Sequence, residues 1–274
     1  MTQPTQAAAG LDPYNDTADY GPWRFLHRLN PLSKAAALLP VMVLVIFTRD
    51  IYTPLLILLL TVALILVGAH LSRRALVTLL VGLPVFVVVI ATSFGLWTAP
   101  GDVDHSVILF QIGEYRFYLG AFLIGLATSL RLSSLLVMAL LGGLTTTGPD
   151  MVRSMVQQLK VPYRIGYTAL AAYRFVPRFG FELETIRQAH RVRGVAGGRG
   201  PIAAFKRYYG YVIPLLAGAI RHAERVALAM DSRAFGAHPT RTERFLVPFR
   251  VRDWVFVLAF WAAVAVIVVT SPPG

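Results

Sequence analysis

Long continuous apolar segments constrain this 274-residue chain more than any other feature of its sequence. A helix needs about 20 predominantly apolar residues to cross a bilayer. The chain is 56% hydrophobic and its mean hydropathy is +0.61, which is high for a soluble domain. Because the segments are continuous rather than alternating, they predict membrane helices and not barrel strands. We expect spans at residues 33–48, 53–71, 75–98, 117–144 and 254–270.

The spacing of these segments predicts the fold class and its domains. We expect an all-α membrane protein with about five transmembrane helices and a helical domain inserted before the last of them. The expected regions are an N-terminal tail at 1–32, helices one to four within 33–147, the inserted domain at 148–250, and the last helix with the C-terminus at 251–274. The tail has no basic stretch followed by an apolar core, so we do not expect a cleavable signal peptide.

The distribution of charge predicts the orientation. Residues 149–253 hold 18 Lys and Arg against 7 Asp and Glu, a net charge of +11. Lys and Arg stay on the cytoplasmic side of a membrane, so we expect the inserted domain and the N-terminus in the cytoplasm of a multi-pass cell-membrane protein. Lys34, near one end of the first span, is expected to snorkel toward the interface. Topology alone explains the basic charge, so we expect no nucleic-acid partner.

Within the inserted domain, helical periodicity predicts three helices. A short amphipathic helix should end at Pro162, and two longer runs follow at 164–193 and 202–235. Pro177 is expected to kink or interrupt the first of these runs. Apolar stripes run along both, at Phe179, Leu183, Ile186 and Ala189 in the first and at Leu216, Ile220, Ala223, Ala227, Met230 and Ala234 in the second. We expect the two helices to cross closely along these narrow stripes.

The two long runs end alike. Residues 189–196 read AHRVRGVA and residues 229–236 read AMDSRAFG, so each contains Ala, three further residues, Arg and a small residue. Gly194 and Gly236 suit helix C-caps, and an arginine in a last turn is favoured by the helix dipole. We therefore expect Arg193 and Arg233 at the C-terminal tips of the two helices.

Motifs for catalysis are missing from the sequence. The glycine-rich GVAGGRG stretch lacks the Gly-Lys-Ser/Thr of a phosphate loop, and none of the six histidines forms an HExxH motif. The acidic residues form no metal-binding cluster of the kind that a membrane-bound transferase would use. We therefore predict no catalytic residue, no metal site and no enzyme activity.

Arg131 is the ionisable residue that lies deepest in a predicted span, beside Ser129, Ser133 and Ser134. An unpaired arginine at mid-bilayer costs several kcal/mol, so it needs a partner or a wet cavity. It either packs helices and subunits together or lies on a substrate pathway. The second possibility leaves a stand-alone secondary permease as the alternative function.

Four segments, taken in order, resemble the transmembrane T component (EcfT-like, cobalt/biotin-type permease) of energy-coupling-factor (ECF) transporters. They are LHRLNPLSK at 26–34, LKVP at 159–162, YRFVPRFGFELETIRQAHRVRG at 173–194 and ALAMDSRAFG at 227–236. The two arginine motifs depart from the family's Ala-Arg-Gly pattern, because neither has alanine before the arginine. They read Val192-Arg193-Gly194 and Ser232-Arg233-Ala234.

The resemblance implies a non-catalytic coupling subunit of an ABC importer for vitamins or metal ions. Its coupling helices would dock two ABC ATPase subunits through these two motifs, supported by Ala189, Ala229, Met230, Phe235 and Pro177. A membrane-embedded substrate-binding S component would bind to the membrane part and the coupling helices. ATP and Mg would belong to the partner ATPases, with no cofactor in this chain.

Overall fold

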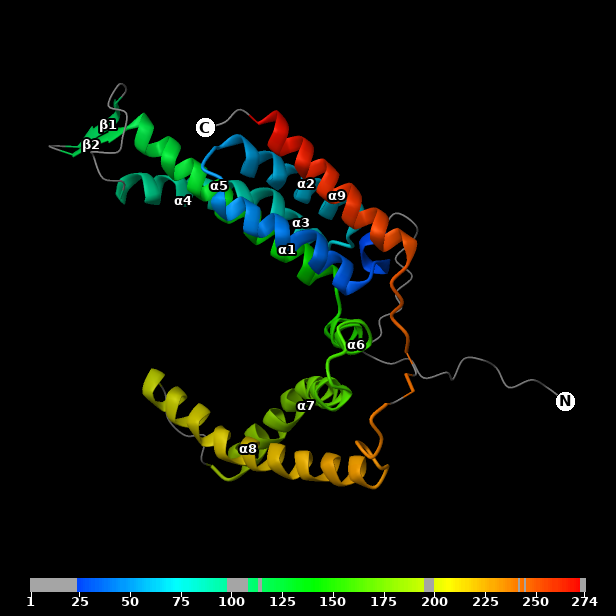
Figure 1. Ribbon diagram of the computed structural model, residues 1–274. Coiled ribbons are helices and arrows are strands. Elements are labelled where there is room, and N and C mark those ends of the chain that lie inside the picture. Colours follow the sequence, from blue (N-terminus) through cyan, green and yellow to red (C-terminus); the bar gives the residue numbers. More distant parts are fainter. Residues whose placement is uncertain are drawn as a thin grey trace. The chain divides into compact units, whose positions relative to one another are not determined.

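The computed structural model describes residues 24–97, 108–112, 115–194, 200–240, 242–243 and 245–271. The chain divides into two compact units (Figure 1). The first is formed by residues Met1–Met151 and Pro248–Gly274, and the second by Val152–Val247. Of the expected N-terminal tail at 1–32, residues 1–23 lie outside the described residues.

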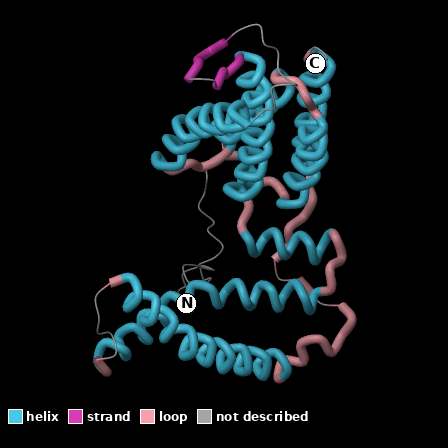
Figure 2. The backbone as a smooth tube through the Cα atoms, turned by 90° about the vertical axis from the view of Figure 1, so that its left-hand side faces the viewer, coloured by secondary structure: helices cyan, strands magenta, loops and turns pink. Residues whose placement is uncertain are grey.

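Packed helices make up the first unit (Figure 2). They are α1 (Pro31–Phe47), α2 (Tyr52–Gly68), α3 (Arg73–Val77), α4 (Leu83–Trp97), α5 (Leu119–Thr145) and α9 (Val251–Thr270), with a π-helical turn η3 (Thr78–Gly82) joining α3 to α4. Among the described residues, three helical stretches are long and apolar enough to cross a membrane: Arg73–Trp97, Leu119–Thr145 and Val251–Thr270. The helical fold class is confirmed.

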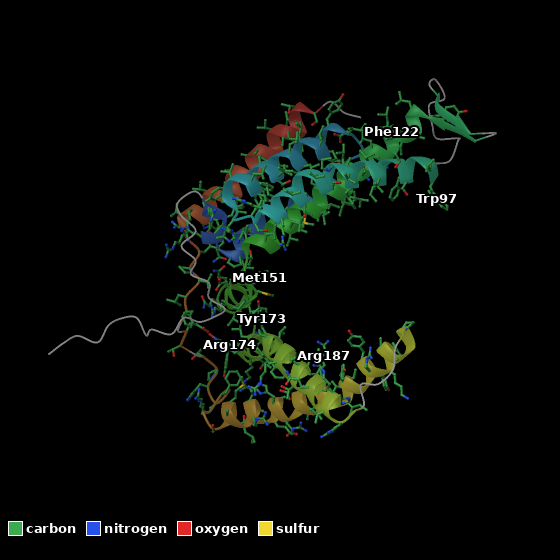
Figure 3. The ribbon with its side chains drawn as sticks, turned by 180° about the vertical axis from the view of Figure 1, so that it is seen from behind. Trp97, Phe122, Met151, Tyr173, Arg174 and Arg187 are labelled. Atoms are coloured by element: carbon green, nitrogen blue, oxygen red, sulfur yellow. The ribbon has the colours of Figure 1, made fainter. Side chains whose placement is uncertain are left out.

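The other two expected spans are shorter apolar helices. Both α1 and α2 have 17 residues, which at 1.5 Å per residue is about 25 Å, against a hydrocarbon core of about 30 Å. The expected count of five spans is therefore supported only roughly. Trp97, which is 89% exposed, and Phe122 lie near neighbouring ends of α4 and α5 (Figure 3). Aromatic rings at such helix ends are typical of the membrane–water interface.

A short β-hairpin precedes α5 and was not expected. Strands β1 (Ile108–Ile112) and β2 (Tyr115–Tyr118) pair antiparallel (Figure 2). Their residues are mostly β-branched and aromatic, which favours strands. The expected span at 117–144 consequently begins two residues too early, because its first residues are apolar enough for a helix but belong to β2.

The start of α1 is set by its own sequence. The Asn30 side chain accepts a hydrogen bond from the N–H of Leu32 at 2.9 Å, and Pro31 takes the first helical position. An asparagine cap satisfies one of the free N–H groups at a helix start, and proline there sacrifices no intrahelical bond. The segment LHRLNPLSK thus contains most of a 3-10 turn, η2 (Phe25–Arg28), and the first residues of α1.

Lys34 lies in the first turn of α1 and is only 1% exposed. Its ammonium group donates to the carbonyl of Leu26 at 3.2 Å, to the carbonyl of Thr145 at 2.7 Å and to the Thr145 hydroxyl at 3.2 Å. The expected snorkelling of Lys34 is therefore wrong. The amine stays inside because three acceptors satisfy its three donors, and because the C-terminal end of α5 is the negative end of a helix dipole.

Asp253 makes the matching connection at the start of α9 and is fully buried. Its Oδ1 accepts the N–H of Asn30 at 2.7 Å and the Ser33 hydroxyl at 3.3 Å, while Oδ2 accepts the N–H of Arg250 at 2.7 Å. A carboxylate is stabilised there because the N-terminal ends of two helices present their N–H groups to it. Lys34 and Asp253 therefore join α1 to α5 and α9 at one end of the first unit.

Helices α4 and α5 approach each other closely at small residues. A Cβ atom added to Gly125 would lie 2.1 Å from the carbonyl oxygen of Ala91 and 2.8 Å from the backbone nitrogen of Gly95. Small residues at such a crossing let membrane helices pack backbone to backbone.

We predict that Lys34→Met destabilises the protein. The variant keeps an unbranched side chain but leaves the buried carbonyl of Thr145 without its ammonium donor, at a cost of about 1–3 kcal/mol. The carbonyl of Leu26 also loses the ammonium group and keeps only the N–H of Leu29, at 3.4 Å. The thermal unfolding temperature of the purified protein in detergent should fall clearly. Lys206→Met, at an exposed position on α8, is the control and should change it little. An unchanged unfolding temperature in Lys34→Met would contradict this account.

We predict opposite results for two alanine substitutions in α5. Gly125→Ala should lower the unfolding temperature, because its Cβ would overlap the backbone of α4. Gly143→Ala should be neutral or stabilising, since nothing lies within 4 Å of the added atom and alanine is the better helix former by about 1 kcal/mol. Equal effects of the two substitutions in the same thermal assay would show that α4 and α5 do not pack closely.

Candidate partner-docking site

Two long helices make up most of the second unit. The shorter helix α6 (Gly148–Gln158) precedes them, and most of its residues belong to the same unit. The two long helices are α7 (Tyr163–Val192) and α8 (Pro201–Asp231). Each runs through an internal proline without a break, so Pro177 does not interrupt α7, and the expected kink there stays a prediction. Proline removes one hydrogen bond and is unfavourable inside a helix, but packing on either side can offset this cost. Phe175 and Phe179, which flank Pro177, lie edge to face with ring centroids 4.4 Å apart.

Aromatic side chains and a glycine form the interface between α7 and α8, which we call the seam. Phe175 of α7 stacks on His222 of α8 with centroids 4.3 Å apart, and His190 meets Tyr211 edge-on at 5.2 Å. Between these contacts, a Cβ added to Gly218 would lie 2.9 Å from a carboxylate oxygen of Glu182. The α8 side of the seam therefore runs through residues 211, 218 and 222.

The apolar stripe predicted for α8 is not this seam. Leu216 and Ile220 are 57% and 59% exposed, and Ala223 and Ala227 are exposed as well. Leu216 and Ile220 each lie two positions from a seam residue, which is about 200° around a helix and so on the opposite face. The periodicity identified a real apolar face but not what covers it. In the α7 stripe Phe179, Leu183 and Ile186 are partly buried, whereas Ala189 is exposed.

The first arginine motif closes α7. Arg193 is the capping residue, right-handed at φ −76° and ψ 0°, and its N–H donates to the carbonyl of Ala189 at 3.1 Å. Gly194 follows with φ +71° and donates to the carbonyl of Arg191 at 3.1 Å. The side chain of Val192, just before them, is 89% exposed. The predicted glycine cap of the first run is confirmed.

The second motif closes α8 with a Schellman motif. Ser232 caps the helix, its hydroxyl donating to the carbonyl of Ala229 at 3.0 Å. The N–H of Ala234 donates to Asp231 at 2.9 Å and the N–H of Phe235 donates to Met230 at 3.0 Å, the pair of bonds that defines this motif. Ala234 has φ +55°, so it occupies the left-handed position that usually holds glycine. The expected cap at Gly236 is therefore two residues off.

In both motifs the arginine directly precedes a left-handed residue. Arg193 precedes Gly194 and Arg233 precedes Ala234, and both arginines are exposed. A left-handed residue turns the chain away from the helix axis. The likeness of the two sequence motifs thus corresponds to a likeness of backbone geometry.

The chain after the second motif is held by the first turns of α7. Tyr163 packs edge-on against Phe235 with centroids 5.7 Å apart, and its hydroxyl donates to the carbonyl of His238 at 2.5 Å. Arg164 donates to the carbonyl of Gly236, and the Tyr167 hydroxyl to the Glu243 carboxylate. The sequence motifs do not indicate these supporting residues, because contacts between residues 72 to 76 positions apart leave no periodic signal.

Arg131, in the middle of α5, is partly buried and its Nε has no hydrogen-bond partner. Ser133, which is fully buried, also has an unpaired hydroxyl. The charge of Arg131 also affects the pKa of Asp50, which lies in the loop between α1 and α2. Burial alone would raise the pKa of the Asp50 carboxyl, but hydrogen bonds from Thr53 and the charge of Arg131 outweigh burial and lower it.

Apolar helices long enough to cross a membrane, together with a helical unit whose two long helices end in arginine motifs, define a helical membrane protein. The chain belongs to the CbiQ family of cobalt transport proteins, whose family model matches residues 23–243 and so includes both arginine motifs.

Curated relatives agree with this family. The chain is 27% identical over 226 residues to the energy-coupling factor transporter transmembrane protein EcfT of Bacillus subtilis, covering 80% of this chain and 83% of the relative. It is 28% identical over 249 residues to EcfT of Streptococcus thermophilus, covering 87% and 91%. It is 28% identical over 261 residues to EcfT of Limosilactobacillus fermentum, covering 90% of each. The predicted resemblance to an EcfT-like component of ECF transporters is confirmed.

We predict that Ala234→Gly stabilises the second unit. Glycine adopts φ +55° freely, whereas a left-handed conformation costs other residues about 1–2 kcal/mol. The matched control is Ala223→Gly, in the right-handed interior of α8, which should destabilise by about 1 kcal/mol. Protection of the α8 amides in hydrogen exchange measures both. A loss of protection in Ala234→Gly would contradict the Schellman geometry.

Proposed function

We propose that this chain is the coupling subunit of an ECF-type ABC importer for a vitamin or a metal ion. In this role Val192-Arg193-Gly194 and Ser232-Arg233-Ala234 dock two ATPase subunits. The observation that carries the proposal is the shared geometry of the two helix ends, where each exposed arginine directly precedes a left-handed residue. The names of the curated relatives, which are transmembrane proteins of energy-coupling factor transporters, support it.

Chemistry favours arginine for this contact. A guanidinium group donates a fork of hydrogen bonds to a carboxylate and stays charged at any physiological pH. The small residue after each arginine leaves the backbone open to close approach. Around the second tip, Ala229 and Met230 supply carbonyls to the cap and Phe235 packs against Tyr163, so these residues support the arginine's position.

An S component has a suitable surface on α8. Apolar side chains recur at Tyr209, Ile213, Leu216 and Ile220, which are 66%, 69%, 57% and 59% exposed. Their spacing of four, three and four residues puts them on one face of the helix. An exposed apolar strip of this kind is typical of an interaction surface. We propose that it contacts the membrane-embedded S component.

Energy in this assembly comes from the partners. ATP and Mg bind to the ATPase subunits, and this chain needs no cofactor to relay their motion through α7 and α8. The net charge of +11 on residues 149–253 supports a cytoplasmic position for the coupling helices, in a multi-pass protein of the cell membrane.

We predict that Arg193→Glu combined with Arg233→Glu abolishes ATPase recruitment and substrate uptake while the chain still inserts into the membrane. Charge reversal turns each attraction to a carboxylate into repulsion. Copurification of the ATPases with the tagged chain measures recruitment, and uptake in whole cells measures function. The control, Arg187→Glu with Arg221→Glu, reverses one arginine on each helix away from the tips and should retain both. Full copurification and uptake in the tip variant would refute arginine docking.

A stand-alone secondary permease is the second candidate, favoured by the buried Nε of Arg131 that has no hydrogen-bond partner. Reconstitution of the purified chain alone into liposomes separates the two functions. The coupling subunit should catalyse no gradient-driven uptake of cobalt or biotin without ATPases. Gradient-driven uptake that disappears in Arg131→Gln would establish the permease instead.

A further inference from the structure

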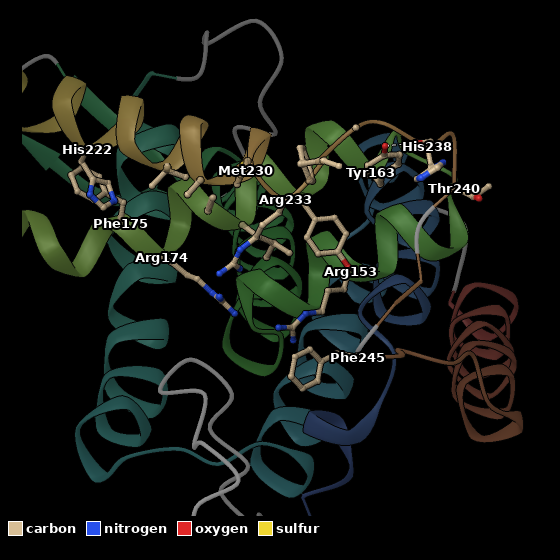
Figure 4. Close-up of a pocket in the computed structure, with 18 of the residues that line it drawn as sticks. Arg153, Tyr163, Arg174, Phe175, His222, Met230, Arg233, His238, Thr240 and Phe245 are labelled. Carbon is tan, nitrogen blue, oxygen red and sulfur yellow. Dashed lines mark hydrogen bonds between the residues drawn. The ribbon is translucent and has the colours of Figure 1, made fainter.

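A cavity of about 850 Å³ lies within the second unit (Figure 4). Its walls come from α7, from the end of α8 and from the chain that follows α8, with Arg153 of α6 at one side. Cavities of about 300–1,000 Å³ are the usual size of small-molecule sites.

Positive charge surrounds this cavity. Arginines line it at positions 153, 174, 178 and 233, and no Asp or Glu is found among its described lining residues. Figure 4 shows the guanidinium groups of Arg153, Arg174 and Arg233 extending into the same space from three different elements. An anion that entered this space would be attracted to each of these guanidinium groups.

Arg153 is held firmly in this arrangement and is only 6% exposed. Its guanidinium carbon lies 4.7 Å from the centroid of the Phe245 ring, a cation–π contact. The segment that carries Phe245 is fixed in turn, because Gln157 donates to the Phe245 carbonyl at 2.8 Å and accepts the N–H of Val247 at 2.9 Å. The arginine is thus positioned in advance rather than free to turn into solvent.

The remaining wall is apolar and aromatic. It includes the stacked pair of Phe175 and His222, together with Leu170 and Met230. A bare inorganic ion would leave this surface uncovered. A ligand with a charged head and an organic part would use both sides of the cavity.

We propose that this cavity binds an organic phosphate, with its phosphoryl group at the arginines and its organic part against the Phe175–His222 stack. Phosphate suits the site better than a single carboxylate, because it has up to two charges and three acceptor oxygens for several guanidinium forks. The same chemistry can come from a soluble nucleotide or from the headgroup of an anionic lipid.

The test uses the purified full-length chain in a neutral detergent. Equilibrium binding of ADP in the presence of EDTA examines the soluble source. Native mass spectrometry after addition of phosphatidylglycerol, with phosphatidylcholine as the neutral comparison, examines the lipid source. We expect saturable binding of ADP or phosphatidylglycerol with one ligand per chain. Arg174→Gln with Arg178→Gln should weaken it at least about tenfold, since each lost charge-assisted hydrogen bond contributes about that factor.

The matched control is Arg187→Gln with Arg191→Gln. It removes two arginines of the same helix at the same spacing but outside the cavity, and it should leave binding unchanged. Binding of ADP alone identifies a soluble ligand, and binding of phosphatidylglycerol alone identifies a lipid. Equal weakening by both double variants, or no saturable binding of either probe, would overturn the proposal. The variants leave Arg193 and Arg233 unchanged. The test of ligand binding is therefore independent of the test of ATPase docking.

Discussion

The first unit depends on a buried ammonium group and a buried carboxylate in neighbouring positions of the fold. Lys34 ties the start of α1 to the end of α5, and Asp253 ties the same start to the start of α9. Charges this well buried persist because every donor and acceptor finds a partner and because helix ends of the right polarity face them. Residues from the beginning, middle and end of the chain therefore meet at one place, where the last membrane helix returns to the first.

The ends of α7 and α8 are the most closely defined features of the second unit. At both tips backbone hydrogen bonds fix the position of the residue that carries the guanidinium group. The α8 tip has an additional support, because the first turns of α7 hold the chain on both sides of Gly236. Alanine at the left-handed position of this tip is mildly strained, which is tolerated where the surrounding contacts determine the conformation.

Patterns local in the sequence predicted most of the architecture. Apolar runs located the membrane helices, and the arginine motifs located the ends of α7 and α8 to within a residue or two. Errors arose where a distant contact decides the outcome. Lys34 resembles a snorkelling lysine until Thr145 is placed beside it. The stripe through Leu216 and Ile220 resembles a seam until Gly218 and His222 are seen to fill that role.

The sequence by itself determined the class of protein, the helices and the two arginine tips, because hydrophobicity and capping act over a few neighbouring residues. Only the tertiary structure decided which faces of α7 and α8 meet, how the buried Lys34 and Asp253 are satisfied, and that Arg153, Arg174 and Arg233 surround one cavity. Helical periodicity indicates whether one face of a helix is apolar or charged, but it does not indicate which element packs against that face. That information comes from packing between residues far apart in the chain.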